Sequence, residues 1–252
     1  MATQKITVRE AHVGLPGIGA TERDDRWWVE PLVTGVALVV LVAYSTYAVL
    51  AGNNYRYGPY ISPFYSPYFN VPISPAIVVA WIPGLFRVSC YYYRKAYYRA
   101  LFLSPPACAV SEPRRTYTGE LRPPLSWLPI VHRWALYASI VVLAFLWADT
   151  VRAFDFDGHF GAGIGSLVLL VNVILLTGFT FGCHALRSLV GGNVRCFSCA
   201  PLGEARRKMW LGVTLFNSRH QFYAWTSLFS VVIADLYVRL CAAGVITDLR
   251  LF

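Results

Sequence analysis

The sequence predicts an all-α protein, an integral membrane bundle of five transmembrane helices. The first observation behind this prediction is composition: of 252 residues, 56% are hydrophobic and only 14% are charged, which is outside the range of ordinary soluble domains. The second is that five separate segments each supply the roughly 20 apolar residues that a helix needs to cross the hydrocarbon core. The third is an aromatic share of 15%, which suits the belts of Tyr and Trp found at membrane surfaces.

The five predicted spans occupy approximately residues 31–51, 75–96, 127–151, 163–190 and 221–243. The second span contains Pro83 and Gly84, which predict a kink at that point. It continues into a run of Tyr, Arg and Lys residues, whose last turns we expect at the lipid headgroups. We expect the whole chain, residues 1–252, to form a single transmembrane domain, with a polar tail over residues 1–30 that lacks a secretory signal.

The orientation is predicted from the cations, because cytoplasmic loops carry an excess of Lys and Arg. The basic connections are the one after the second span, with Arg99, Arg114, Arg115 and Arg122, and the one after the fourth, with Arg195, Arg206, Arg207, Lys208 and Arg219. The loop after the first span has only Arg56, and the loop after the third balances Arg152 against Asp155 and Asp157. The N-terminus is therefore predicted to be cytoplasmic and the C-terminus outside.

The same topology accounts for the formal net charge of +9, so nucleic acid is not an expected partner. The expected surroundings are membrane lipid, and the expected location is the inner (plasma) membrane of the cell. Such a chain crosses the membrane several times.

Several Cys and His residues gather near one depth in this topology. His132 lies about one turn into the third span, Cys183 and His184 lie near the end of the fourth, His220 opens the fifth, and Cys90 lies in the inner half of the second. Polar groups inside a bundle are costly and often mark function, although any single Cys can be a small buried hydrophobe. The grouping predicts a site on the cytoplasmic side.

The charges near this group favour a thiolate that binds metal. Arg87, Cys90, Arg94 and Tyr97 have the spacing of one helical face, and nearby cations stabilise the thiolate form of Cys. Thiolates and imidazoles together suit an iron–sulfur centre. Two Cys on one iron and two His on the other is the Rieske arrangement, whose potential is higher than that of clusters with Cys ligands alone.

Two other interpretations stay open at this point. A b-type haem on the cytoplasmic side, held by two of His132, His184 and His220, is the main chemical alternative, but it leaves the Cys and Arg residues unexplained. A transporter or a structural membrane protein is the other alternative, for which an internal repeat or a pair of broken helices at mid-membrane would be expected.

Three smaller patterns are interpreted as structural or incidental. Cys196 and Cys199 form a CxxC without a second half-site, so we interpret them as incidental thiols, not as a zinc site. The pairs Asp149–Arg152 and Asp235–Arg239 have the spacing of salt bridges within a helix, and we expect them to be structural.

Five short segments carry a resemblance to a known family. They are Ser89–Arg99 (SCYYYRKAYYR), Ser104–Val110 (SPPACAV), Gly182-Cys183-His184 with Gly191-Gly192, Asn217–His220 (NSRH) and Asp235–Arg239 (DLYVR). The chain resembles the single-chain, five-helix membrane anchor of the actinobacterial class of succinate dehydrogenase. The resemblance extends from the second span to the C-terminus.

The resemblance implies a subunit of a succinate:quinone oxidoreductase with no succinate site of its own. Such an anchor binds a flavoprotein subunit and an iron–sulfur subunit on its cytoplasmic face. It passes electrons to quinone through a membrane-embedded Rieske-type [2Fe-2S] cluster, where related fumarate reductase anchors use haem b. One departure is visible, because relatives often follow the Cys-His pair with further Cys and His, and here Ala185–Ser188 follow.

The ligands that the resemblance implies are Cys90 and Cys183 as thiolates, with two of His184, His220 and His132 as imidazoles; His184 and His220 are preferred. His132 is the reserve imidazole. Cys108 is the reserve thiolate, because a continuous helix would carry it away from Cys90 unless the chain folds back after Pro105-Pro106.

Aromatic residues near this end of the third span are candidates for contact with the quinone ring. Trp127 and Trp134 are predicted to stack on the ring, with Arg133 beside them. Residues of an interfacial belt have the same appearance in a sequence, so this assignment depends on where the side chains point.

Overall fold

A computed structural model describes residues 17–69, 74–113 and 125–252 of the chain. The first part of the predicted polar tail, residues 1–16, lies outside the described residues. So do Arg114, Arg115 and Arg122, three of the cations used to predict the orientation.

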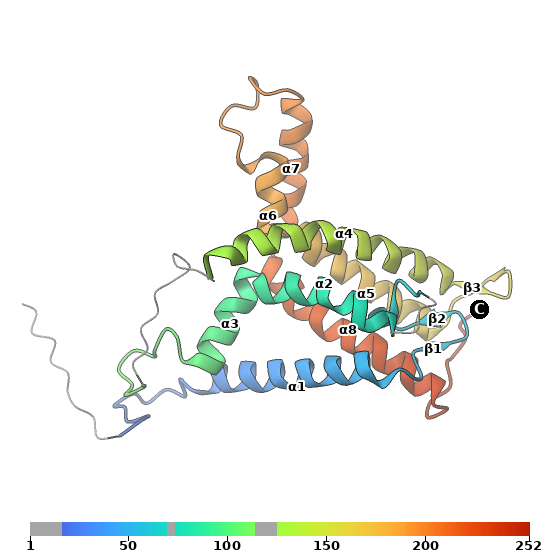
Figure 1. The fold of residues 1–252 in the computed structure, drawn as a ribbon, viewed down its shortest axis with the longest axis horizontal. Helices are drawn as coiled ribbons and strands as arrows, with labels where there is room; N and C mark the ends of the chain where they lie inside the picture. Colours follow the sequence, from blue (N-terminus) through green and yellow to red (C-terminus); the bar gives the residue numbers. More distant parts are fainter. Residues whose placement is uncertain (1–16, 70–73, 114–124) are drawn as a thin grey trace, which may run out of the picture.

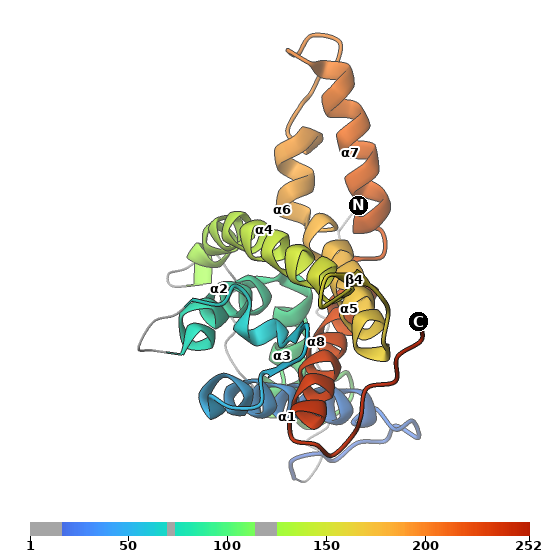
Figure 2. The same cartoon turned by 90° about the vertical axis from the view of Figure 1, so that its right-hand side faces the viewer.

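The described residues are mostly helical (Figure 1). The α-helices are α1 (Val29–Ala51), α2 (Pro75–Ser89), α3 (Tyr91–Phe102), α4 (Leu128–Arg152), α5 (Ile164–Phe181), α6 (His184–Arg187), α7 (Gly203–Asn217) and α8 (His220–Ala242). Three shorter turns of helix accompany them, η1 (Pro63–Tyr65), η3 (Leu125–Trp127) and the π-helical η4 (Ser188–Gly192). The helices α1 and α4 lie on opposite sides of the bundle in both views (Figures 1 and 2).

Four of the described helices are long and apolar enough to cross a membrane, namely α1, α4, α5 and α8. The pair α2 and α3 passes the same test when taken together, with a bend of 75° between the two helices. The described residues therefore contain four candidate spans, or five if the bent pair crosses the membrane as one unit.

The bend of 75° lies at Cys90, after Pro83–Gly84. The helix α2 continues through Pro83 and Gly84. Cys90 itself has extended backbone angles, φ −65° and ψ 134°, and it ends α2 and caps α3. The predicted second span, which continued without a break to residue 96, is corrected accordingly.

The fourth span also ends earlier than predicted, at Phe181 and not at residue 190. Cys183 has almost the same backbone angles as Cys90, φ −62° and ψ 133°, and it caps the short helix α6. An extended residue cannot continue an α-helix, so the chain changes direction at both Cys residues.

Two small antiparallel hairpins modify the all-α prediction. β1 (Arg56–Tyr57) pairs with β2 (Tyr60–Ile61), and β3 (Asp155–Phe156) pairs with β4 (His159–Phe160). Each turn contains a glycine in the left-handed region, Gly58 at φ 53° and Gly158 at φ 85°. Both hairpins lie in the loops after α1 and α4, at the end of the bundle away from the Cys residues (Figure 1).

A buried polar network fixes the same end of the bundle. Arg239 Nε donates to Asp235 Oδ2 at 2.8 Å, and both side chains are buried, which confirms the predicted structural pair. Tyr44 Oη donates to the same carboxylate at 2.6 Å, and Ser62 Oγ donates to its other oxygen. Arg239 also donates to the Ala48 carbonyl at 2.6 Å, so helices α1 and α8 and the loop after α1 are tied together.

The second predicted pair is confirmed as well. Arg152 Nη1 lies 3.1 Å from Asp149 Oδ1 at the end of α4, with the Arg152 side chain largely exposed. Asp149 also accepts a hydrogen bond from Ser66 Oγ at 2.5 Å.

Residues 184–217 leave the bundle sideways as a helical hairpin, here called the lateral hairpin (Figures 1 and 2). The segment formed by α6 and η4 runs outward, and α7 returns to the start of α8. Arg206 holds the two arms together, because its Nε donates to the Val190 carbonyl at 3.1 Å. Cys196 and Cys199 are joined by a disulfide in the connection between the arms, so their interpretation as incidental thiols was wrong.

Candidate functional site

The two Cys residues at the helix breaks are buried in one apolar cluster. Cys90 is 2% exposed and Cys183 is fully buried. The cluster around them includes Phe86, Leu136 and Phe179, which come from α2, α4 and α5. The breaks in the helices therefore bring two thiols from distant parts of the sequence into the same water-poor interior.

His132 of α4 faces one of these thiols. Its Nε2 atom lies 3.1 Å from Cys183 Sγ. Its Nδ1 atom lies 3.1 Å from the Phe86 carbonyl oxygen and 3.1 Å from Ser89 Oγ. A carbonyl can only accept, so Nδ1 carries the proton and Nε2 presents its lone pair to the sulfur. Phe86 also stacks on the imidazole, with ring centroids 4.7 Å apart and planes 12° apart.

His220, the first residue of α8, faces the other thiol. Its Nε2 atom lies 3.8 Å from Cys90 Sγ, and the side chain is buried. Phe179 stacks on its ring at a centroid distance of 5.0 Å and an angle of 10°. Its Nδ1 atom is buried and has no hydrogen-bond partner among the described residues. A Cβ at Gly182 would approach this atom to 2.9 Å, so the glycine gives the imidazole its space.

Arg87 of α2 brings a positive charge to the edge of the cluster. Its guanidinium carbon lies 4.6 Å from the centroid of Phe179, the ring that stacks on His220. It donates hydrogen bonds to Ser227 Oγ at 3.0 Å and to the hydroxyl of Tyr93. These contacts hold the cation in place beside the two pairs of donors.

Four of the six predicted donors come together, and two do not. Cys90 pairs with His220, and Cys183 pairs with His132, the reserve imidazole of the sequence analysis. His184 is exposed at the start of α6, because the turn at Cys183 directs the next residue away from the cluster. Cys108 is exposed in the loop after α3.

The donor set consists of two thiols and two imidazoles, the kinds of ligand that a Rieske-type two-iron cluster needs. Within residues 17–69, 74–113 and 125–252, no three His, Cys, Asp or Glu side chains surround one point suited to an ion. The donors form two pairs, each of one thiol and one imidazole, whereas a Rieske centre takes two Cys on one iron and two His on the other, so the pairs would have to separate around it. Among the described residues, the unpartnered Nδ1 of His220 also agrees with a site built for a bound group. The residues therefore fit the cluster in the number and kind of donor, and not in their present pairing.

The three predicted quinone contacts point away from this site. Trp127 is 60% exposed and Trp134 is 69% exposed. Arg133, which directly precedes Trp134, is exposed as well. They lie on the outer surface of the bundle within two turns of His132. Their position is that of an interfacial belt.

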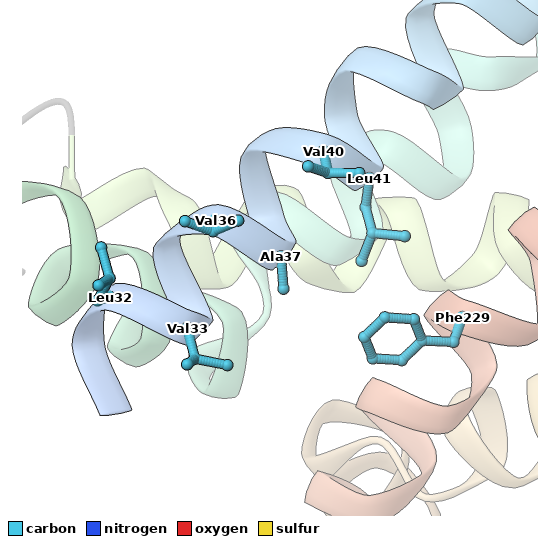
Figure 3. Close-up of a pocket in the computed structure, with 7 residues that line it drawn as sticks. All are labelled: Leu32, Val33, Val36, Ala37, Val40, Leu41 and Phe229. Carbon is cyan, nitrogen blue, oxygen red and sulfur yellow. The ribbon is translucent and has the colours of Figure 1, made fainter. Parts of the chain in front are cut away.

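Two of the hollows beside the described helices lack what a quinone ring needs, one in volume and the other in polar lining groups. A cavity of about 40 Å³ beside Arg87 and Ser139 is far smaller than the roughly 300–1,000 Å³ typical of ligand pockets. An open groove of about 430 Å³ runs between α1 and α8, lined only by apolar side chains (Figure 3). Its lining residues are Leu32, Val33, Val36, Ala37, Val40, Leu41 and Phe229.

The sequence analysis missed the residues that position the imidazoles. Phe86, Ser89, Phe179 and Gly182 look like ordinary membrane residues in the sequence. One signal was available for His132, because Ser89 precedes Cys90 and a short polar side chain there can reach a neighbouring helix. Nothing in the sequence indicated which helix that would be.

Comparisons with known proteins identify the family. The profile of the family described as "Actinobacterial succinate dehydrogenase subunit SdhC" matches residues 29–244. A chain of a solved structure, "Mycobacterium smegmatis Sdh1 complex in the apo form", is 39% identical, with 92% of this chain and 94% of that chain covered and a TM-score of 0.82. A search of curated proteins gave no significant match. The chain therefore belongs to the family of actinobacterial succinate dehydrogenase membrane subunits, SdhC.

Proposed function

We propose that this chain is the quinone-reactive anchor of its succinate dehydrogenase and that Cys90, Cys183, His132 and His220 hold a Rieske-type [2Fe-2S] cluster. The observation that carries the proposal is that two buried thiols and two imidazoles come together at one end of the bundle, with distances of 3.1 Å for Cys183–His132 and 3.8 Å for Cys90–His220. Membership of the family indicates which complex the chain belongs to, and the four donor side chains support the proposed cofactor.

The proposal includes the topology predicted from the cations. The bent pair α2–α3 forms one of five spans, the N-terminus is cytoplasmic and the C-terminus is outside, in the plasma membrane. Arg99, with Lys95 on the same helix, and the cations of the lateral hairpin belong to the end of the bundle that carries the donors. In this orientation the proposed site lies near the cytoplasmic surface, where a flavoprotein subunit and an iron–sulfur subunit would bind.

A bound cluster with imidazole ligands would supply a one-electron carrier of raised potential, which suits transfer to quinone. The residues of the chain prepare the site for it. The Phe86 carbonyl fixes the His132 tautomer, so that Nε2 is free to bind metal. Phe86 and Phe179 cover the imidazoles and exclude water.

The charges of the chain also support binding of a negatively charged group. Cys90 caps the N-terminus of α3, where free backbone N–H groups favour a thiolate. The Arg87 guanidinium adds a full positive charge in the same low-dielectric region. Two thiolates are therefore less costly to bury here than in an uncharged interior.

We also propose that quinone binds against the exposed side chains near the start of α4. Trp127, Arg133 and Trp134 lie on the same helix as His132, and their exposure makes them accessible from the lipid phase, where quinone dissolves.

The test uses the purified complex with His132→Ala and His220→Ala, and with His184→Ala as the matched control at the same end of the bundle. Low-temperature electron paramagnetic resonance should show one iron–sulfur signal lost in the first two variants and kept in the control. Iron and acid-labile sulfide should fall by the content of one cluster. Loss of the signal in the His184→Ala complex, with His132→Ala unchanged, would reject this ligand set.

The same samples separate the alternatives. A reduced-minus-oxidised spectrum with haem bands would show instead a b-type haem held by His132 and His220, as in a related fumarate reductase anchor. A complex without either cofactor in this chain would leave a structural membrane anchor.

A further inference from the structure

The lateral hairpin is strongly basic and projects from one end of the bundle. The lateral hairpin and the two residues after it, 184–219, have six Lys or Arg residues and one carboxylate, Glu204. Both views show the hairpin extending sideways, across the direction of the long helices (Figures 1 and 2). A hairpin that leaves a transmembrane bundle in this direction runs along the membrane surface and not away from it.

Two of the six cations stabilise the hairpin itself. Arg206 binds the Val190 carbonyl, and Arg187 donates to Thr214 Oγ1 at 3.0 Å and lies over the ring of Trp210. The other four are exposed, namely Arg195, Arg207, Lys208 and Arg219. In the part of the chain that the structure describes, Lys208 is the one of these four with an ion pair, to Glu204 at 3.3 Å, and both side chains of the pair are about 70% exposed.

Large apolar side chains are exposed on the same helix. Met209 is 50% exposed, Leu211 is 47% exposed and Leu215 is 67% exposed. Along α7 the cations precede these residues, so the basic half is farther from the bundle and the apolar half adjoins it. Exposed leucines beside cations are typical of helices that lie at a membrane interface.

The base of the hairpin lies at the level of an interfacial belt. Cys183 caps α6, and its sulfur lies 3.1 Å from His132. The next two residues of α4, Arg133 and Trp134, are exposed on the bundle surface. Trp and Arg at one depth mark the boundary between hydrocarbon and headgroups, so the hairpin leaves the bundle at that boundary.

We infer that the lateral hairpin lies in the headgroup layer of the cytoplasmic leaflet and binds anionic phospholipid. Arg195, Arg207 and Lys208 contact the phosphate groups, and Leu211 and Leu215 enter the acyl region. The choice of leaflet rests on the proposed orientation, and the choice of anionic lipid rests on charge complementarity, since the cytoplasmic leaflet is the negatively charged one. The exposed leucines favour lipid over a soluble subunit as the occupant.

The test measures amide hydrogen–deuterium exchange of the α7 peptide in the purified complex. The complex is placed in nanodiscs of phosphatidylcholine alone or of phosphatidylcholine mixed with phosphatidylglycerol. Exchange of α7 amides should slow with phosphatidylglycerol, because lipid binding suppresses local opening. Each Lys or Arg at an anionic surface contributes about a fivefold change in affinity, so three cations should give at least about a tenfold slowing. High salt should remove the difference.

Three variants identify the side chains that cause the slowing. Arg195→Gln/Arg207→Gln/Lys208→Gln should abolish it, whereas the matched control Arg56→Gln/Arg152→Gln/Arg250→Gln, which removes the same charge at the other end of the bundle, should keep it. Leu211→Gln/Leu215→Gln should raise α7 exchange in both lipids. Unchanged exchange of α8 peptides shows that each variant is folded.

Two results would overturn the inference. One is equal exchange of α7 in the two lipids for the unmodified complex. The other is protection of the α7 amides that is the same in both lipids and disappears when the soluble subunits are removed. That result would show that the hairpin contacts a protein subunit and not lipid. Neither result changes the iron–sulfur signal, so a failure here is distinct from a failure of the proposed cofactor site.

Discussion

His132 Nε2 lies 3.1 Å from Cys183 Sγ, although 51 residues separate the two along the chain. The contact joins α4 to the turn between α5 and α6, and it depends on Cys183 ending one helix and starting the next. The second contact, between His220 and Cys90, repeats this relationship between a helix break and an imidazole. The geometry leads to four further predictions.

Gly182→Ala should displace His220. The added Cβ would lie 2.9 Å from His220 Nδ1 and 2.7 Å from the Gly178 carbonyl oxygen, both closer than real contacts allow. Overpacking of this kind costs about 1–3 kcal/mol. Thermal unfolding of the purified complex should show the loss, together with an altered iron–sulfur signal. Gly212→Ala in α7 is the control, because its Cβ meets nothing within 4 Å; an equal effect of both variants would argue against the steric explanation.

Arg87→Gln should lower the midpoint potential of a group bound at the site. The guanidinium is fixed over Phe179 at 4.6 Å, and its loss removes a positive charge that favours the reduced state. For a charge in a partly buried environment the shift is on the order of tens of millivolts. Redox titration of the iron–sulfur signal measures it. Arg87→Lys keeps the charge and should restore most of the potential, and a potential that is the same in all three proteins would contradict the role.

Asp235→Asn should destabilise the end of the bundle away from the site. Arg239 would keep its buried charge without a carboxylate, and breaking a buried ion pair from one side costs about 3–5 kcal/mol. The amount of assembled complex and its thermal stability should both fall. The control is Glu204→Gln, whose pair with Lys208 is exposed and contributes about 0–1 kcal/mol.

Tyr60, in the loop after α1, should make the stability sensitive to alkaline pH. Burial, together with its hydrogen bond to Asp248 at 2.6 Å, raises the pKa of Tyr60 to about 12. The unfolded chain ionises at its ordinary pKa of about 10. The stabilisation is therefore complete below about pH 10 and is lost as the pH rises through about 12.

Thermal unfolding at several alkaline pH values checks this dependence. Tyr60→Phe should lose about 1 kcal/mol at neutral pH, because the hydrogen bond is gone. The stability of this variant should then decline less steeply with pH than that of the unmodified protein between about pH 10 and about pH 12. Parallel curves for the two proteins would exclude Tyr60 as the source.

The spans could be predicted because an apolar segment of sufficient length has no better environment than lipid. The ends of α1 and α4 agree with the prediction to within two residues. The bend at Cys90 and the end of α5 could not be predicted, because the residues around them are good membrane residues that would also continue a helix. The lateral hairpin was missed for a different reason, because its α7 arm carries too much charge to be recognised as a span.

The sequence by itself determined the composition of the site: thiols, imidazoles and cations at one end of an apolar bundle. The depth of a side chain in the membrane follows from its position along a transmembrane helix, which can be read from the sequence. Only the tertiary structure decided which donors meet. The direction of a side chain around its helix depends on how the neighbouring helices pack, and that packing turned His132 inward to Cys183 and left His184 exposed.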